Sequence, residues 1–221
     1  MSQQIESLQS ARISSWGRIN PARLNAVLQF AGQTVLDVGC STGQYVNYLN
    51  SNGYRAFGLD ILKDPTWQTI SPRNYVIADA KQLPVAPHRV QTVMSFEVLE
   101  HTINPVNVLR EYHRVCQKNV ILSVPYCEFP QDILRSGMVY AHWRDQSHCN
   151  FFTRELLIEY LELAGFFVTS ITHINPILPD YIALRSLHVP FRIAYFASRV
   201  LRRIPLRKKY FMTLLAIAKK V

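Results

Sequence analysis

Five short apolar segments recur along the first 125 residues, and polar stretches with helical spacing separate them. They lie near residues 34–38, 54–59, 74–78, 90–95 and 119–124. Strands that alternate with helices are typical of a parallel sheet with helices on both faces. This part of the sequence therefore predicts a doubly wound α/β fold.

The C-terminal part adds two apolar segments and a long connection. Residues 166–174 and 210–218 read as a sixth and a seventh strand, with the last strand antiparallel beside the sixth. The predicted sheet is thus seven-stranded, Rossmann-like and mostly parallel. Residues 175–209 exceed an ordinary hairpin loop, and we expect this insertion to contribute to specificity.

Two segments with helical spacing come before the first strand. Residues 5–14 form one, and residues 21–30 form the other, with Asn20 placed as a cap and Pro21 at the first helical position. We expect residues 1–31 to form a helical cap over the ligand site. The chain has 221 residues, 48% of them hydrophobic, which suits one domain over its whole length.

A glycine-broken turn follows the first apolar segment, in the sequence VLDVGCSTG. Gly39 and Gly43 remove Cβ atoms where the backbone must bend and approach a ligand, and Ser41 or Thr42 can cap the next helix. The order is D-x-G-x-x-x-G, with Asp37 at the strand end, instead of the G-x-G-x-x-G of dinucleotide sites. A carboxylate there disfavours a phosphate and favours a cationic ligand.

This motif resembles the first motif of the class I S-adenosylmethionine-dependent methyltransferases, of the quinone-biosynthesis type, whose cofactor carries an ammonium and a sulfonium. The resemblance extends over residues 34–118. Asp60 ends the second apolar segment, 23 residues after Asp37, and Asp79 ends the third. By resemblance, Asp60 accepts from the ribose hydroxyls and Asp79 from the adenine amino group. The cofactor-binding residues that the resemblance implies are Asp37, Gly39, Cys40, Gly43, Asp60, Ile61, Asp79, Ala80 and Phe96.

A group of acids and histidines lies near the end of the fourth segment. Glu97, Glu100 and His101 have the spacing i, i+3 and i+4, and share one face if the chain is already helical at Glu97. With His148 they form a plausible set of ligands for a divalent metal. The set resembles that of the quinone-precursor and small-RNA O-methyltransferases. The alternative is that Glu100 lies near the cofactor and His101 is packed, without a metal.

Several side chains are candidates for activating the acceptor. His101 and His148 are the predicted catalytic residues, because an imidazole can act as general base towards a hydroxyl, and His142 is a further candidate. The predicted reaction is O-methylation of a small or lipid-linked acceptor, such as a glycan intermediate or a quinone precursor. The alternatives are an RNA methyltransferase, and a non-catalytic cofactor-binding protein that acts through its basic tail.

The net charge of +9 comes from the tail, where residues 175–221 hold ten Lys and Arg but a single acid, Asp180. Within residues 183–204, one helix face is apolar and the other carries arginines. This face could bind an anionic membrane surface, bind RNA, or pack on the domain or a second copy. We favour lipid over RNA because aromatic and aliphatic residues are abundant. The apolar positions are Ile193, Phe196, Ala197, Val200 and Ile204, and the basic ones Arg192, Arg199, Arg202 and Arg203.

The cysteines and the N-terminus bear on location. Four cysteines without a C-x-x-C pair read as reduced thiols, and the first residues lack a secretory signal pattern. We expect a cytoplasmic protein, peripheral on the inner face of the membrane if the basic segment binds lipid.

Overall fold

The computed structural model describes residues 19–70, 72–127, 145–204 and 209–221, together with positions 131 and 135. Seven strands form one sheet, with the bounds β1 (Thr34–Val38), β2 (Arg55–Asp60), β3 (Tyr75–Ile77), β4 (Val90–Phe96), β5 (Cys116–Pro125), β6 (Phe166–Ile177) and β7 (Tyr210–Lys220). The order is β3-β2-β1-β4-β5-β7-β6, in which β7 runs antiparallel to both of its neighbours. The predicted seven-stranded, mostly parallel sheet is confirmed.

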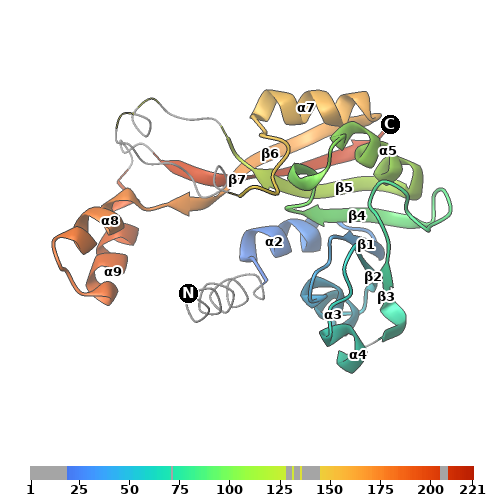
Figure 1. Cartoon of the computed structure of the whole chain (residues 1–221), viewed down its shortest axis with the longest axis horizontal. Helices are drawn as coiled ribbons and strands as arrows, with labels where there is room; N and C mark the ends of the chain where they lie inside the picture. Colours follow the sequence, from blue (N-terminus) through green and yellow to red (C-terminus); the bar gives the residue numbers. More distant parts are fainter. Residues whose placement is uncertain (1–18, 71, 128–130, 132–134, 136–144, 205–208) are drawn as a thin grey trace.

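Helices cover both faces of this sheet (Figure 1). Their bounds are α2 (Pro21–Phe30), α3 (Gln44–Ser51), α4 (Thr66–Ile70), α5 (Pro105–Val115), α7 (Arg154–Leu163), α8 (Pro179–Ser186) and α9 (Phe191–Leu201), with short 3-10 turns at η1 (Pro72–Asn74) and η2 (Leu99–His101). Buried residues of α2, α3 and α4 form one hydrophobic cluster, and those of α5 and α7 form the other. The doubly wound arrangement follows from these two clusters.

The helix starts show which local predictions hold. The Asn20 side chain accepts hydrogen bonds from the backbone N–H groups of Ala22 and Arg23, and Asn104 caps α5 in the same way through Asn107. The cap at Asn20 is as predicted. The prediction that Ser41 or Thr42 caps α3 is wrong, because Gly43 occupies the cap position and no side chain caps this helix.

The last two strands extend beyond the rest of the sheet. β5 ends opposite Thr213, whereas β6 and β7 continue to pair as far as Ile177 and Tyr210. Residues 175–177, which the sequence assigns to the insertion, are therefore strand. The two-stranded ribbon carries α8 and α9 away from the body of the sheet (Figure 1).

Two further points concern the predicted N-terminal helical cap and membrane-spanning helices. Of the predicted cap over residues 1–31, α2 is described and packs on the same face as α3, while residues 5–14 lie outside the described residues. Within the described ranges, no helix is long and apolar enough to cross a bilayer.

Candidate active site

The turn after β1 lies where the strand order reverses, between β1 and β4. Gly39, Ser41 and Gly43 have φ values of 81°, 47° and 76°, so alternate residues adopt the left-handed conformation. A Cβ atom at Gly39 would collide with the side chain of Val98, and one at Gly43 with the ring of Tyr75. Both positions thus require glycine. Ligands of doubly wound folds bind at this edge, beyond the carboxyl ends of the strands.

The carboxylate of Asp60 lies against this turn. One oxygen accepts a hydrogen bond from the backbone N–H of Ser41 at 2.9 Å, and the other from that of Leu62 at 3.1 Å. Each carboxylate oxygen has a further lone pair. The Asp60 side chain is half-buried, so its carboxylate can accept further hydrogen bonds from a ligand at the turn.

Asp37 lies behind the turn in the middle of the sheet. It is 2% exposed, in register with Gly58 of β2 and Met94 of β4. Burial, and then the negative charge of Asp60, raise the pKa of Asp37 to about 8. A cation bound nearby would favour the ionised form of this carboxyl.

The remaining predicted cofactor residues are spread along the same edge. Ile61 is exposed directly after β2, and Asp79 is exposed after β3, where its carboxylate accepts from the backbone N–H of Lys81 at 2.9 Å. Ala80 beside it is half-buried. Phe96, at the end of β4, packs against Tyr45 with ring centroids 5.1 Å apart.

Cys40 differs from these residues, because its side chain points into the core. It is 7% exposed, and a Cβ atom at Gly58 would come within 2.8 Å of its sulfur. Burial raises the pKa of the Cys40 thiol, so the group stays protonated. Any contact of Cys40 with a ligand must therefore come from its backbone.

Two residues that the sequence did not identify hold the turn in place. The Trp67 indole N–H donates to the backbone carbonyl of Ser41 at 2.7 Å, and the Thr66 hydroxyl donates to that of Thr42 at 3.0 Å. Trp67 is buried and stacks on Tyr75, with centroids 5.1 Å apart. The available signal was the sequence Asp-Pro-Thr-Trp soon after Asp60, which places a helix start and a large aromatic next to the turn.

The prediction of a helical face that begins at Glu97 is wrong. Glu97 has a φ of 59°, which is left-handed, and helical structure begins only at η2. Its carboxylate forms an ion pair with Arg23 of α2 and accepts from the Ser123 hydroxyl at 3.0 Å. Arg23 also lies over the ring of Phe96, 5.3 Å from its centroid. Arg23 is a further residue that sequence reasoning missed.

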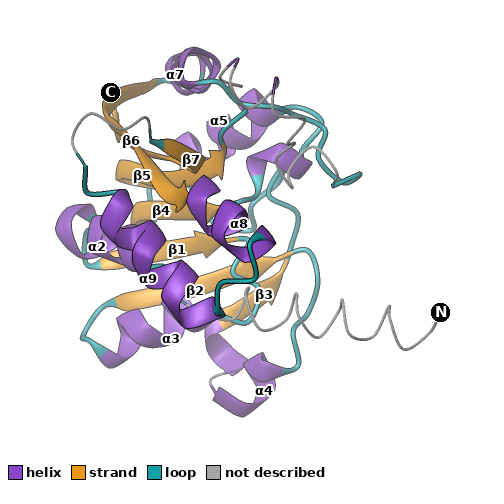
Figure 2. Ribbon diagram, turned by 90° about the vertical axis from the view of Figure 1, so that its left-hand side faces the viewer, coloured by secondary structure: helices purple, strands orange, loops and turns teal. Residues whose placement is uncertain are grey.

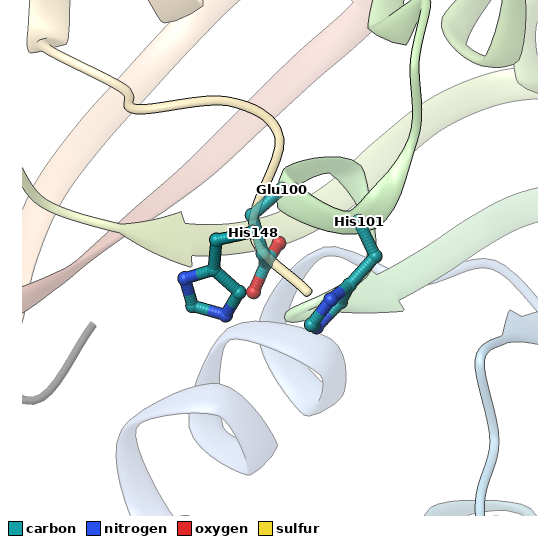
Figure 3. A group of neighbouring side chains, drawn as sticks. All are labelled: Glu100, His101 and His148. Carbon is teal, nitrogen blue, oxygen red and sulfur yellow. The ribbon is translucent and has the colours of Figure 1, made fainter. Parts of the chain in front are cut away.

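Glu100, His101 and His148 come together (Figure 3). One ligand atom from each lies within 4.8 Å of the others. Glu100 is 1% exposed, and neither of its carboxylate oxygens accepts a hydrogen bond from the residues that the structure describes. Burial, and then repulsion from Glu97, raise the pKa of Glu100 well above its ordinary value. A buried carboxyl without donors fits a cation as its partner.

Backbone hydrogen bonds bring His148 to this group from a distant part of the chain. The backbone N–H groups of Cys149 and Asn150 donate to the carbonyl of Glu100 at 2.7 and 3.2 Å. The rings of His101 and His148 meet edge to face with centroids 4.7 Å apart. His101 is exposed and can face an acceptor, whereas the His148 side chain is only 7% exposed. His142 lies outside the described residues.

A chain of polar contacts orients the two imidazoles. Nδ1 of His101 lies 3.1 Å from the Ser147 hydroxyl, which donates to Asp145 at 2.6 Å. Asp145 also lies 3.7 Å from Nε2 of His148. Hydrogen bonds from Ser147 hold the pKa of Asp145 below its usual value, so its negative charge faces both histidines.

A family model described as a methyltransferase domain matches residues 13–171, which is well over half of the chain. The chain belongs to this family. It is a class I S-adenosylmethionine-dependent methyltransferase. The glycine turn and the acid at the end of β2 lie at the usual ligand edge of such a fold.

Relatives of this methyltransferase cover only part of the sequence. The ubiquinone biosynthesis O-methyltransferase of Aliivibrio fischeri (strain ATCC 700601 / ES114) is 35% identical over 105 residues, which is 42% of this chain and 45% of the relative. The chain therefore matches less than half the length of the curated relatives.

Solved structures with the same fold cover nearly the whole methyltransferase. A methyltransferase from Archaeoglobus fulgidus has a TM-score of 0.64 and 19% identity, over 90% of this chain and 92% of its own. The 1,6-didemethyltoxoflavin-N1-methyltransferase of Burkholderia thailandensis has a TM-score of 0.65 and 18% identity, over 100% of this chain and 86% of its own. At such identities the likeness concerns the fold alone.

Proposed function

We propose that this methyltransferase moves the methyl group of S-adenosylmethionine to an oxygen of a small or lipid-linked acceptor, such as a quinone precursor or a glycan intermediate. The observation that carries the proposal is the group of Glu100, His101 and His148, beside the glycine turn. Val98, which a side chain at Gly39 would strike, links the turn to η2. Cofactor and acceptor sites are thus neighbours.

The residues around the turn fit this cofactor. The half-buried Asp60 has free acceptor capacity for the ribose hydroxyls, and Asp79 is exposed for the adenine amino group. Asp37 gives the site a buried carboxyl that a positively charged ligand stabilises in its ionised form. Exposed Ile61 offers an apolar surface to the adenine ring. S-adenosylmethionine supplies a methyl group on a sulfonium, which leaves as a neutral thioether.

The group around Glu100 fits a divalent metal. Glu100, His101 and His148 would hold it, since one carboxylate and two imidazoles suit several divalent ions. Glu97 is engaged with Arg23 and Ser123, so it is not part of this set in the present structure. When bound, a divalent metal would lower the pKa of an acceptor hydroxyl that coordinates it.

Where no metal is bound, the histidines would instead take the proton that leaves the acceptor hydroxyl. His101 is exposed at the edge of the site, and Ser147 and Asp145 fix the orientation of its ring. An imidazole held in this way can act as general base towards a hydroxyl within hydrogen-bond reach. Alignment of the acceptor oxygen with the methyl group contributes most of the remaining rate enhancement.

The partial match to ubiquinone biosynthesis O-methyltransferases supports transfer to oxygen. The match covers 42% of this chain, so it does not identify the acceptor of this methyltransferase. An acceptor with two neighbouring oxygens, such as a catechol, is the chemistry that a metal at Glu100 would select.

The test is methyl transfer from labelled S-adenosylmethionine to 3,4-dihydroxybenzoate and to membrane lipid extracts, with magnesium, manganese or zinc in parallel, or with a chelator. We expect an O-methylated product with at least one of these metals, and loss of turnover in Glu100→Gln while S-adenosylmethionine still binds. His88→Gln, a change at an exposed histidine just before β4, is the control and should keep full activity. Turnover by Glu100→Gln equal to that of the wild type would refute the proposed role of this site.

A further inference from the structure

The helical hairpin formed by α8 and α9 lies at the end of the ribbon formed by β6 and β7, away from the body of the sheet (Figures 1 and 2). α8 packs against α9, and Tyr181 meets Phe191 edge to face, with centroids 5.9 Å apart. The hairpin is therefore a small structural unit at the tip of the ribbon. Its position raises the question of what its outer surface contacts.

The apolar stripe of α9 does not face the body of the protein. The buried residues of this helix are Ala194 and Ser198. Residues of the predicted apolar face are exposed, with Phe196 at 70%, Ile193 at 59% and Val200 at 47%. Large apolar side chains at this exposure, in a continuous stripe on one helix, mark an interaction surface.

Basic side chains lie directly beside this stripe. Arg199, Arg202, Arg203 and Lys209 line a shallow hollow at the end of α9. A neighbouring hollow combines Arg192 with apolar side chains of the same helix. Since Asp180 is the single acid after residue 174, little negative charge is available to neutralise these cations.

We propose that the α8–α9 hairpin binds the surface of a bilayer that contains anionic phospholipids. The exposed stripe of Phe196, Ile193 and Val200 would enter the boundary between headgroups and acyl chains, and the cationic hollow would hold lipid phosphates. A helix with one apolar and one basic face is the kind that lies in this interface. The charge complementarity and the bulk of the apolar side chains together favour this partner.

A nucleic acid fits these observations less well. Binding to RNA would use the arginines, but it would leave Ile193, Val200 and Ile204 in water, because aliphatic side chains do not stack on bases. A lipid surface uses both faces of α9 at once.

The hairpin lies at the same edge of the sheet as the candidate active site. β5 ends at Pro125, opposite Thr213, and the ribbon continues from that point towards α8. Glu100 and the glycine turn also lie beyond the carboxyl ends of parallel strands. A hairpin on the bilayer would therefore keep the site close to the membrane, where a lipid-linked acceptor would be found. Membrane binding itself does not depend on the proposed function.

The test is flotation of the full chain with vesicles of phosphatidylcholine alone, or of phosphatidylcholine mixed with phosphatidylglycerol. We expect binding to the mixed vesicles, weakened by salt. Both Ile193→Ser/Phe196→Ser and Arg199→Glu/Arg203→Glu should reduce partitioning by about tenfold or more. Because all four positions are exposed, these variants should keep the wild-type melting temperature and affinity for S-adenosylmethionine.

Matched controls lie elsewhere on the surface. Phe167→Ser removes an exposed aromatic residue at the start of β6, and Arg55→Glu/Lys118→Glu reverses two exposed charges on β2 and β5. Both should bind vesicles as the wild type does. Failure of the wild type to float with anionic vesicles would overturn the proposal. So would binding that tolerates the α9 changes, or a preference for RNA that depends on the arginines and not on Phe196.

Discussion

The indole N–H of Trp67 donates a hydrogen bond to the backbone carbonyl of Ser41 at 2.7 Å. This bond joins α4 to the glycine turn, whose residue Ser41 in turn donates its N–H to Asp60 at 2.9 Å. The turn is therefore held from both sides, by an aromatic side chain on its carbonyl and by an acid on its amide. Its conformation depends on residues up to 26 positions away in the sequence.

Replacing Trp67 should loosen this turn. Trp67→Phe keeps an aromatic ring for stacking on Tyr75 but removes the bond to Ser41, so we expect the protein to lose about 1–2 kcal/mol of stability. The affinity for S-adenosylmethionine should fall several-fold, as measured by calorimetry. Tyr54→Phe, an aromatic change in the same hydrophobic cluster, is the control. An unchanged affinity in Trp67→Phe would show that cofactor binding at the turn does not depend on the hydrogen bond from Trp67.

Gly43 provides a second test of the turn. Gly43→Ala places a methyl group against Tyr75 in a left-handed backbone, and should destabilise the protein by about 2–4 kcal/mol. Gly53 has a similar φ of 85° but open space around it. Gly53→Ala should therefore destabilise the protein only through its left-handed backbone, by about 1 kcal/mol. Equal melting temperatures for the two variants would contradict the close approach of Tyr75.

Asp37 should make stability depend on pH. Its pKa is raised to about 8 from 3.8, so the folded protein holds a proton that the unfolded chain releases between these values. The free energy of unfolding contributed by Asp37 is therefore greatest in acid, and it is lost as pH rises through 8. The Asp37→Asn variant has no carboxyl group at this position, so its free energy of unfolding lacks this pH-dependent loss.

The expected result is a melting temperature for Asp37→Asn that exceeds that of the wild type by several degrees near pH 8, and by less near pH 5. Glu100 also has a raised pKa, but it is present in both proteins, so the difference between them isolates Asp37. Glu159→Gln, an exposed acid on α7, should show no such trend. A constant difference across the pH range would contradict the raised pKa of Asp37.

Local signals in the sequence predicted much of this molecule. The asparagine cap at position 20 acts on residues two and three positions away, so the spacing alone locates the start of α2. The mostly parallel sheet and the antiparallel β7 beside β6 follow the predicted fold. The meeting of His148 with Glu100 depends on hydrogen bonds between segments almost 50 residues apart, which only the resemblance suggested.

Tertiary packing decided what the local pattern could not. The apolar face of α9 was correctly located on the helix, but spacing does not say whether a face is covered, and this one is exposed. At Glu97, the spacing suggested a helical face, whereas the ion pair with Arg23 from α2 accompanies a left-handed backbone. No pattern around residue 97 contains information about Arg23.

Everything proposed for Glu100 and the histidines requires S-adenosylmethionine at the glycine turn. The most direct test is calorimetric titration of S-adenosylmethionine and S-adenosylhomocysteine into the wild type and into Asp60→Ala. We predict micromolar binding to the wild type, and binding at least about tenfold weaker in Asp60→Ala, because hydrogen bonds to a charged group contribute about 1.5–3 kcal/mol. Absence of binding to the wild type, or equal affinity in Asp60→Ala, would contradict the assignment of the cofactor site.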